Sequence, residues 1–222
     1  MTGAVPDEAA QVEQICGALG LSADETQITA LLRHLSLLRH WNSTYNLSAI
    51  RGPAEMLTQH LADCLAVVPA LSRRGEAQRL LDVGSGGGLP GIVIAILLPH
   101  WQVTCVDAVA KKVAFLRQVA GALRLPNLQA EHARVEALQA APFDLITARA
   151  FGSLADLVRL TARHLAPEGA WAAMKGRRPD DEIARLLPTV EVFHVEPLQV
   201  PGLSAQRCLV WMRPHGDSRA AN

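Results

Sequence analysis

The sequence of 222 residues lacks paired cysteines, an excess of either charge, and a long apolar run. Its four cysteines are far apart and form no C-x-x-C pair, so we expect neither zinc nor an iron–sulfur cluster, and no other metal. The 21 Lys and Arg residues balance the 21 Asp and Glu residues. The overall charge therefore indicates neither a nucleic-acid partner nor a membrane partner.

No apolar run approaches the roughly 18 residues that a membrane span requires, so we expect no membrane association. The first eight residues contain two acids and lack the apolar core of a signal peptide. These two observations predict a cytoplasmic protein with reduced thiols. Cys105, which lies in an apolar strand-like run, is expected to be a core thiol.

The charges are nevertheless distributed unevenly. Residues 1–78 contain five Lys and Arg against eight Asp and Glu, whereas residues 79–222 contain sixteen against thirteen. This distribution permits an anionic partner on the larger part, and ordinary solvated faces explain it equally well.

The most informative stretch runs from Leu80 to Gly91 and joins a buried strand to a glycine loop and an apolar helix. Five of its last eight residues are glycine, a composition that permits left-handed backbone and close approach of a ligand. The spacing Gly84-x-Gly86 is that of a dinucleotide loop, although alone it is a weak signal. Asp82 favours a cationic or uncharged nucleoside over a pyrophosphate. The alternative is a tight strand-to-helix turn that binds nothing.

The periodicity predicts helices before residue 79 and alternating strands and helices after it. Expected helices cover about 7–20, 23–42 and 53–68, the second of them opened by a capping box over Ser22–Glu25. Expected strands cover 80–83, 102–107, 128–130, 143–148 and 169–174, with helices at 92–98, 110–124, 153–165 and 180–187. A hairpin over 190–200 and 207–213 completes the pattern.

This pattern predicts an α/β fold, a doubly wound parallel sheet with one antiparallel strand near the C-terminus. The length and the apolar content suffice for one domain with a smaller appendage. We assign residues 1–78 to an N-terminal helical extension, residues 79–213 to the nucleotide-binding domain and residues 214–222 to a polar tail.

In such a sheet, ligands bind beyond the carboxyl ends of the strands. Asp107 follows Gly84 by 23 residues, a distance that suits the acid that binds ribose hydroxyls, and its alternative role is a helix cap. Arg149 ends an apolar strand and is expected at the rim of the pocket, unless it is a surface arginine. Phe151 either stacks on a base or packs beneath the next helix.

Two further groups of residues have open roles. Lys175, with Arg177 and Arg178, either contacts phosphates or forms a solvated run. His60 and Asp63 share one helix surface, either as an exposed pair or as one wall of a substrate cleft.

The predicted strand ends bring together no Ser/His/Asp or Cys/His combination, so covalent catalysis has no candidate residue. One reaction that fits this absence is methylation of guanine at ring nitrogen 7. That nitrogen has a free lone pair, and attack needs only correct placement against a sulfonium methyl group.

With these residues in view, the chain resembles the bacterial 16S rRNA methyltransferase G family, also called glucose-inhibited division protein B. The resemblance extends from about Leu31 to Met212, and the run Gly88-Leu89-Pro90-Gly91 separates this family from most S-adenosylmethionine (SAM) enzymes. The matching stretches are Trp41-Asn42, Tyr45 to Ser48, His60-x-x-Asp63, Asp82 to Gly91, Asp107, Lys111 to Leu116, Arg134 to Glu136, Arg149 to Phe151, Lys175-Gly176 and Arg207.

The resemblance implies a class I SAM-methyltransferase Rossmann-like fold and methyl transfer to nitrogen 7 of one guanosine in the 530 loop of 16S rRNA. It implies SAM as cofactor and 16S rRNA or the small ribosomal subunit as partner. The residues expected to bind SAM are Gly84, Gly86, Leu89, Asp107, Val135, Glu136 and Arg149. The residues expected on the substrate side are His60, Phe151, Lys175 and Arg207.

The chain departs from the family pattern at two positions. Gly87 stands where proline is common, and Gln206 precedes Arg207 where an acid is usual. The first departure is expected to loosen the glycine loop slightly, and neither argues against activity.

Two other functions fit parts of the sequence. A nicotinamide oxidoreductase would use the same glycine spacing and Asp107, although Asp82 and the C-terminal hairpin argue against it. A non-catalytic nucleotide-binding or RNA-binding module could share the fold. Nothing in the sequence indicates an obligate partner chain, so we expect a monomer.

Overall fold

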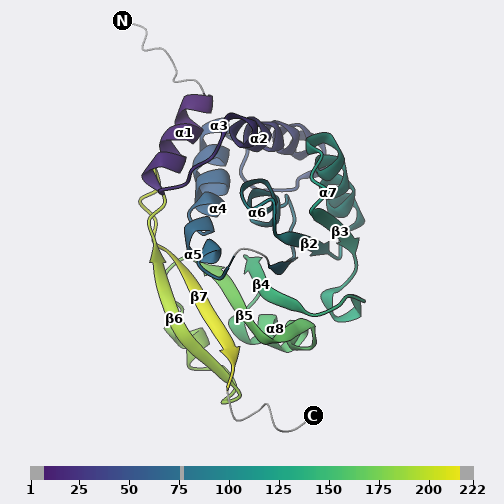
Figure 1. Ribbon diagram of the computed structural model, residues 1–222, viewed down its shortest axis with the longest axis vertical. Coiled ribbons are helices and arrows are strands. Elements are labelled where there is room, and N and C mark those ends of the chain that lie inside the picture. The colour runs from purple at the N-terminus through teal and green to yellow at the C-terminus, as the bar shows by residue number, and fades with distance from the viewer. Residues whose placement is uncertain (1–7, 76–77, 216–222) are drawn as a thin grey trace, which may run out of the picture.

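The computed structural model describes residues 8–75 and 78–215 (Figure 1). Seven strands form one sheet in the order β3-β2-β1-β4-β5-β7-β6. Their bounds are β1 Arg79–Val83, β2 Gln102–Asp107, β3 Leu128–His132, β4 Phe143–Arg149, β5 Leu165–Lys175, β6 Val190–Leu198 and β7 Arg207–Pro214. Strands β1 to β5 pair in parallel, and β7 lies antiparallel between β5 and β6. The predicted fold is confirmed, including its one antiparallel strand.

Helices cover both faces of this sheet. Before β1 lie α1 Glu8–Ala18, α2 Glu25–Tyr45, α3 Pro53–Met56, the π-helix η1 Leu57–Ala62, α4 Asp63–Leu65 and α5 Val68–Ser72. After β1 lie α6 Gly91–Leu97, α7 Ala110–Leu123, η2 Val135–Ala137, α8 Leu154–Thr161, η3 Ala162–His164 and α9 Asp180–Ile183. None of the helices in these described ranges is long and apolar enough to cross a membrane.

The alternation of side chains along each strand divides the core in two. Leu80 joins a cluster formed with the N-terminal helices, α6 and α7, whereas Leu81 joins a cluster with α8 and η2 on the opposite face. Residues from β4, β5 and β7 also contribute to the first cluster. The helices before β1 therefore share one continuous core with the sheet.

Several boundaries differ from the sequence prediction. The N-cap of α2 is Asp24, whose carboxylate accepts from the Gln27 N–H at 2.8 Å, so the capping box assigned to Ser22 is wrong by two residues. Aspartate and serine cap helices about equally well, so residue type alone does not decide between Ser22 with Glu25 and Asp24 with Gln27. The same helix continues to Tyr45 and ends at Asn46, which has a left-handed backbone.

The expected helices over 53–68, 153–165 and 180–187 are broken or shorter. Helix α8 ends at Thr161 because the chain turns early and Leu165 already pairs with Phe143 in the sheet. An irregularity in the pairing of β4 with β5 accommodates Pro167 and Gly169. Strand β5 therefore begins four residues before the expected start at residue 169. Residue 7 and residues 216–222 of the expected tail lie outside the described ranges.

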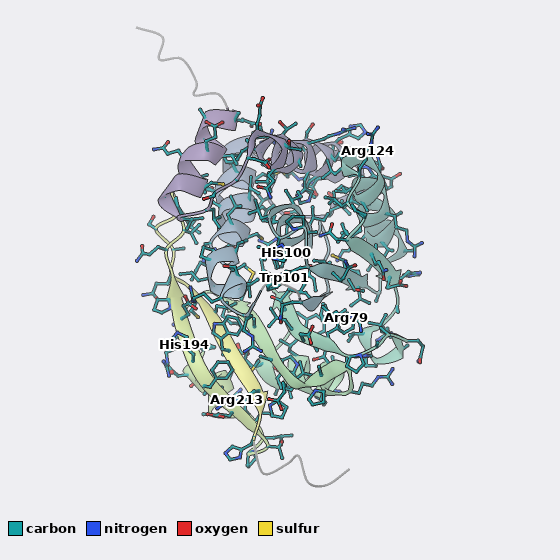
Figure 2. The ribbon with its side chains drawn as sticks, viewed as in Figure 1. Arg79, His100, Trp101, Arg124, His194 and Arg213 are labelled. Carbon is teal, nitrogen blue, oxygen red and sulfur yellow. The ribbon has the colours of Figure 1, made fainter. Side chains whose placement is uncertain are left out.

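The order of strands reverses between β1 and β4, which makes the carboxyl ends of these strands the expected ligand site. Figure 2 labels Arg79, His100 and Trp101, which begin β1 or immediately precede β2 and so mark the opposite edge of the sheet. Trp101 is fully buried there, and the Arg79 guanidinium lies 5.3 Å from the ring centre of Phe143. The buried rings of Trp101 and Phe143 therefore pack at the amino ends of the parallel strands.

Candidate functional site

The glycine loop connects β1 to α6 at the carboxyl ends of the parallel strands. Gly86 has φ +56, and a Cβ built on it would meet only the Gly84 carbonyl oxygen, at 3.8 Å, so its Cα faces open space. Gly88 also has positive φ, but a Cβ there would collide with the Ile92 side chain. The loop thus needs glycine at Gly88 for packing and at Gly86 for its left-handed backbone, and it offers a ligand close access to the Gly86 backbone.

Asp82 lies beneath this loop and is fully buried. Its Oδ2 accepts from the Gly91 N–H at 3.0 Å, while its Oδ1 has no hydrogen-bond partner within the described residues. Burial raises the pKa of this carboxyl to about 6. An ionised carboxylate oxygen without a partner is costly, and a cationic ligand group would satisfy it. The residues present therefore fit a ligand with a positive charge near this point.

A cavity of about 180 Å³ opens beside the loop and brings together most of the residues expected to bind the cofactor. Gly84, Asp107, Val135, Glu136 and Phe151 all line it. Leu89 does not: its side chain is buried in the core beneath the N-terminal helices. Its N–H binds the Ser85 carbonyl at 3.2 Å, so the expected contact of Leu89 with the cofactor stays a prediction.

Asp107 holds the backbone at the carboxyl end of β2. Its Oδ1 accepts from the Val109 N–H at 2.9 Å at the start of α7, and its Oδ2 accepts from the Gly86 N–H at 3.0 Å. The Lys112 Nζ lies 3.6 Å from Oδ2. The carboxylate therefore binds the residue that precedes α7, ties the glycine loop to β2 and lines the cavity, where the ribose role stays a prediction.

Phe151 packs on the glycine loop. A Cβ on Gly84 would lie 2.9 Å from the Phe151 Cδ2, so the ring leaves no room for a side chain at that position. Because Phe151 lines the 180 Å³ cavity, its expected contact with the substrate base has less support than a contact with the nucleoside side of the site.

A second cavity of about 410 Å³ lies on the other side of the β4 end, and Arg149, His60, Asp63 and Arg207 line it. The Asp63 carboxylate accepts from Arg207 Nε at 2.8 Å and lies 3.5 Å from Arg149 Nη1. His60 and Asp63 are 6% and 4% exposed, so the interpretation as an exposed pair is wrong and they form a wall of this cavity. The interpretation of Arg149 as a surface arginine is also wrong.

His60 is held as a neutral ring in this wall. Its Nδ1 lies 3.3 Å from Arg149 Nη1 and 3.2 Å from the Gln59 carbonyl oxygen, and its Nε2 lies 2.6 Å from Ser48 Oγ. Burial and the Arg149 charge lower the pKa of His60 to about 4. At pH 7 the imidazole is uncharged, and both of its nitrogens already have partners.

Lys175 lines the same cavity but is not free. Its Nζ lies 2.9 Å from Glu182 Oε2 and donates to the Gly152 carbonyl at 3.1 Å. A phosphate contact at Lys175 would compete with that ion pair. Of its neighbours, Arg178 pairs with Asp180, and Arg177 is exposed.

The sequence analysis did not assign a role to Ser48. The Asn42 side chain holds the segment that contains it, accepting from the Ser48 N–H at 2.7 Å and donating to the Ile50 carbonyl at 2.9 Å. The signal available in the sequence was the polar run that follows Trp41.

Burial raises the pKa of Cys208, which also lines this cavity, so the cavity contains no thiolate nucleophile at neutral pH. Among the residues that the structure describes, no cluster of His, Cys, Asp or Glu could hold a metal ion.

Comparison with known proteins identifies the family of this chain. The family model described as rRNA small subunit methyltransferase G matches residues 27–210. The chain belongs to this family. Proteins named ribosomal RNA small subunit methyltransferase G are 61% identical in Leptothrix cholodnii, over 89% of this chain and 91% of the relative, and 54% identical in Bordetella pertussis, over 95% and 96%. This member of the methyltransferase G family is an enzyme that uses SAM as its methyl donor.

Solved structures share the fold at low identity. TrmN from Thermus thermophilus is 21% identical, with a TM-score of 0.53 over 71% of this chain and 53% of that one. A SAM-dependent methyltransferase from Aquifex aeolicus is 14% identical, with a TM-score of 0.55 over 71% and 92%. Membership of the rRNA methyltransferase G family rules out the nicotinamide oxidoreductase and the non-catalytic module for this chain.

Proposed function

We propose that this methyltransferase transfers the methyl group of SAM to nitrogen 7 of a guanosine in the 530 loop of 16S rRNA. Methylation of the small-subunit rRNA follows from the family. The observation that supports the finer assignment is the pair of cavities that meet at the end of β4. Arg149 and Ala150 line the larger one, and the next residue, Phe151, lines the smaller. A nucleoside donor in one and a base in the other would approach each other across this segment.

The smaller cavity supplies the groups that a SAM nucleoside needs. Gly84 gives backbone access, Asp107 offers carboxylate oxygens to the ribose hydroxyls, and Val135 and Glu136 border the adenine. Gly86 lies in the adjoining loop, where its Cα faces open space. The bound donor supplies a methyl group on a positively charged sulfur. Asp82 Oδ1, buried and without a partner in the described residues, would accept from the amino group of its methionine part.

The larger cavity suits an RNA acceptor that needs no deprotonation. Two arginines share the single carboxylate of Asp63, so its wall keeps one net positive charge for a phosphate or another anion. His60 is neutral with both nitrogens occupied, so it does not serve as a general base. Nitrogen 7 of guanine needs none, and catalysis rests on placing its lone pair in line with the methyl group.

The test is methyl transfer in vitro, with mass spectrometry to locate the methylguanosine. Purified protein, labelled SAM and small subunits or rRNA that lack the modification should yield 7-methylguanosine in the 530 loop. Label at another base or another ring atom would overturn the assignment of the target. We propose that the protein acts as a monomer in the cytoplasm, which sedimentation of the purified chain and fractionation of cells would test.

The loop assignment has its own variant. Gly86→Val puts a branched side chain on a left-handed backbone, where ligand and loop must approach closely. We expect no measurable SAM binding by calorimetry while the circular dichroism spectrum remains that of the folded protein. Wild-type affinity in this variant would refute the loop as the donor site.

A further inference from the structure

Helix α2 lies near α6 and α7 (Figure 1), and its middle contacts the glycine loop at Gly87. The Gln27 side chain donates to the Ile96 carbonyl at 3.0 Å, which ties the start of α2 to the end of α6. The ring of Trp41 packs on Phe115 of α7, with 5.5 Å between the ring centres. The helix is thus fixed at both ends.

Between these anchors, His34 reaches the loop. The side chain is fully buried, and its Nε2 lies 2.8 Å from the Gly87 carbonyl oxygen. A carbonyl only accepts, so the ring proton resides on Nε2, while Nδ1 has no partner among the described residues. Leu38, one turn later, packs on the same glycine: a Cβ on Gly87 would lie 2.9 Å from the Leu38 Cδ1.

The loop needs support from outside because its glycines restrict the backbone very little. Carboxylates of the sheet hold it at two points, since Asp107 binds the Gly86 N–H and Asp82 binds the Gly91 N–H. His34 holds the Gly87 carbonyl between those points. These contacts fix the backbone from two sides, the sheet and the N-terminal helices.

We propose that His34 is a positioning residue for methyl transfer, and that through it the N-terminal extension keeps the glycine loop in its donor-binding conformation. This inference rests on the proposed donor site. Without the imidazole, the half-buried Gly87 carbonyl would lose its partner, and the loop would relieve this cost by turning the peptide towards water. The apparent dissociation constant rises as the fraction of the competent conformation falls.

The test compares His34→Leu, which removes the donor, with His34→Gln, whose amide nitrogen replaces the imidazole Nε2. In His34→Leu we expect the dissociation constant and the KM for SAM to rise about three- to tenfold, the range for one net hydrogen bond, with kcat at saturating SAM unchanged. His34→Gln should restore both constants to within about twofold of wild type.

Thr161→Val is the matched control for lost stability. The Thr161 hydroxyl is buried in α8, donates to the Leu157 carbonyl at 2.6 Å and accepts from Trp171 at 2.8 Å, on the opposite face of the sheet. This variant should lower the melting temperature and leave the KM for SAM unchanged. Wild-type affinity in His34→Leu, or equally weak binding in His34→Gln, would overturn the inference. A wild-type protein that binds no SAM would overturn the donor site, and the inference with it.

Discussion

At the scale of single residues, the site depends on side chains that hold the backbone and face a ligand at the same time. Asp107 binds two backbone N–H groups and lines the smaller cavity. Asp63 joins two arginines from different strands, both of which line the larger cavity. Substitutions here change both geometry and binding, so each needs a stability measurement beside its binding measurement.

Replacement of Asp107 by alanine removes the proposed ribose acceptor. We expect SAM binding to weaken by about 1–3 kcal/mol, the scale of hydrogen bonds to a charged group, as measured by calorimetry. The melting temperature should fall as well, because the Val109 and Gly86 N–H groups lose their acceptor. Lys112→Met is the control: it removes only a partly exposed charge 3.6 Å away, so affinity should stay near wild type. An unchanged affinity in Asp107→Ala would exclude the ribose role.

Replacement of Arg149 by alanine tests the boundary between the two cavities. Turnover should fall by about tenfold or more, because the guanidinium lines the proposed acceptor cavity at the end of β4, two residues before Phe151 of the smaller cavity. The melting temperature should change little, since Asp63 keeps its ion pair with Arg207. Arg159→Ala, which breaks only an exposed pair with Asp156, should leave turnover intact. A large loss of stability with normal turnover would make Arg149 a structural residue.

At the scale of helices and strands, the cap of α2 offers a direct test of the structure against the sequence pattern. Asp24→Ala should lower the free energy of unfolding by about 1 kcal/mol, the usual cost of a lost N-cap, as measured by urea denaturation. Ser22→Ala should change it little, because the N-cap of α2 is Asp24 and not Ser22. The reverse result would place the cap where the sequence pattern placed it.

The elements were largely predictable because their signals are local. Alternating and helical periodicities identified the strands and most helices, and the single antiparallel strand followed from the terminal hairpin. The boundaries failed where distant groups decide them, as at Leu165, whose backbone pairs with Phe143. The sequence also places His34 on the apolar face of its helix, three residues after Leu31, but no role was predicted for it.

The pairing within the site could not be read from the sequence. His60 meets Arg149 across 89 residues, and Asp63 meets Arg207 across 144. Such contacts depend on the strand order and on the path of the π-helix η1, which no periodicity specifies. Four of the residues expected to bind SAM do line one small cavity, because the carboxyl ends of the parallel strands lie at the same end of the sheet. Their contact with SAM stays a prediction.

At the scale of the whole molecule, buried titratable groups link stability to pH. Burial lowers the pKa values of His34 and His60 from 6.5 to about 4, so their contribution to stability is complete above pH 6.5 and is lost as pH falls towards 4. Burial raises the pKa of Asp82 from 3.8 to about 6, which acts in the opposite direction: its contribution is present at low pH and is lost as pH rises through 6.

The combined effect of His34 and His60 on the pH dependence of the free energy of unfolding is larger than the opposite effect of Asp82. We expect the free energy of unfolding to be about 2–3 kcal/mol lower at pH 5 than at pH 7, as measured by urea denaturation. In His34→Gln this difference should shrink by about 2 kcal/mol, because one of the two groups that gain a proton on unfolding is gone. A pH dependence identical to that of the wild type would show that His34 titrates normally in the folded state.

The ion pair between Asp63 and Arg207 has a consequence for biosynthesis. Its carboxylate lies in α4, before β1, and its guanidinium lies in β7, 144 residues later, so this wall of the larger cavity is complete only after β7 has been synthesised. The apolar side chains of the N-terminal helices likewise pack against residues of β7. A chain truncated before β7 would therefore lack Arg207 and leave the Asp63 carboxylate without this ion pair.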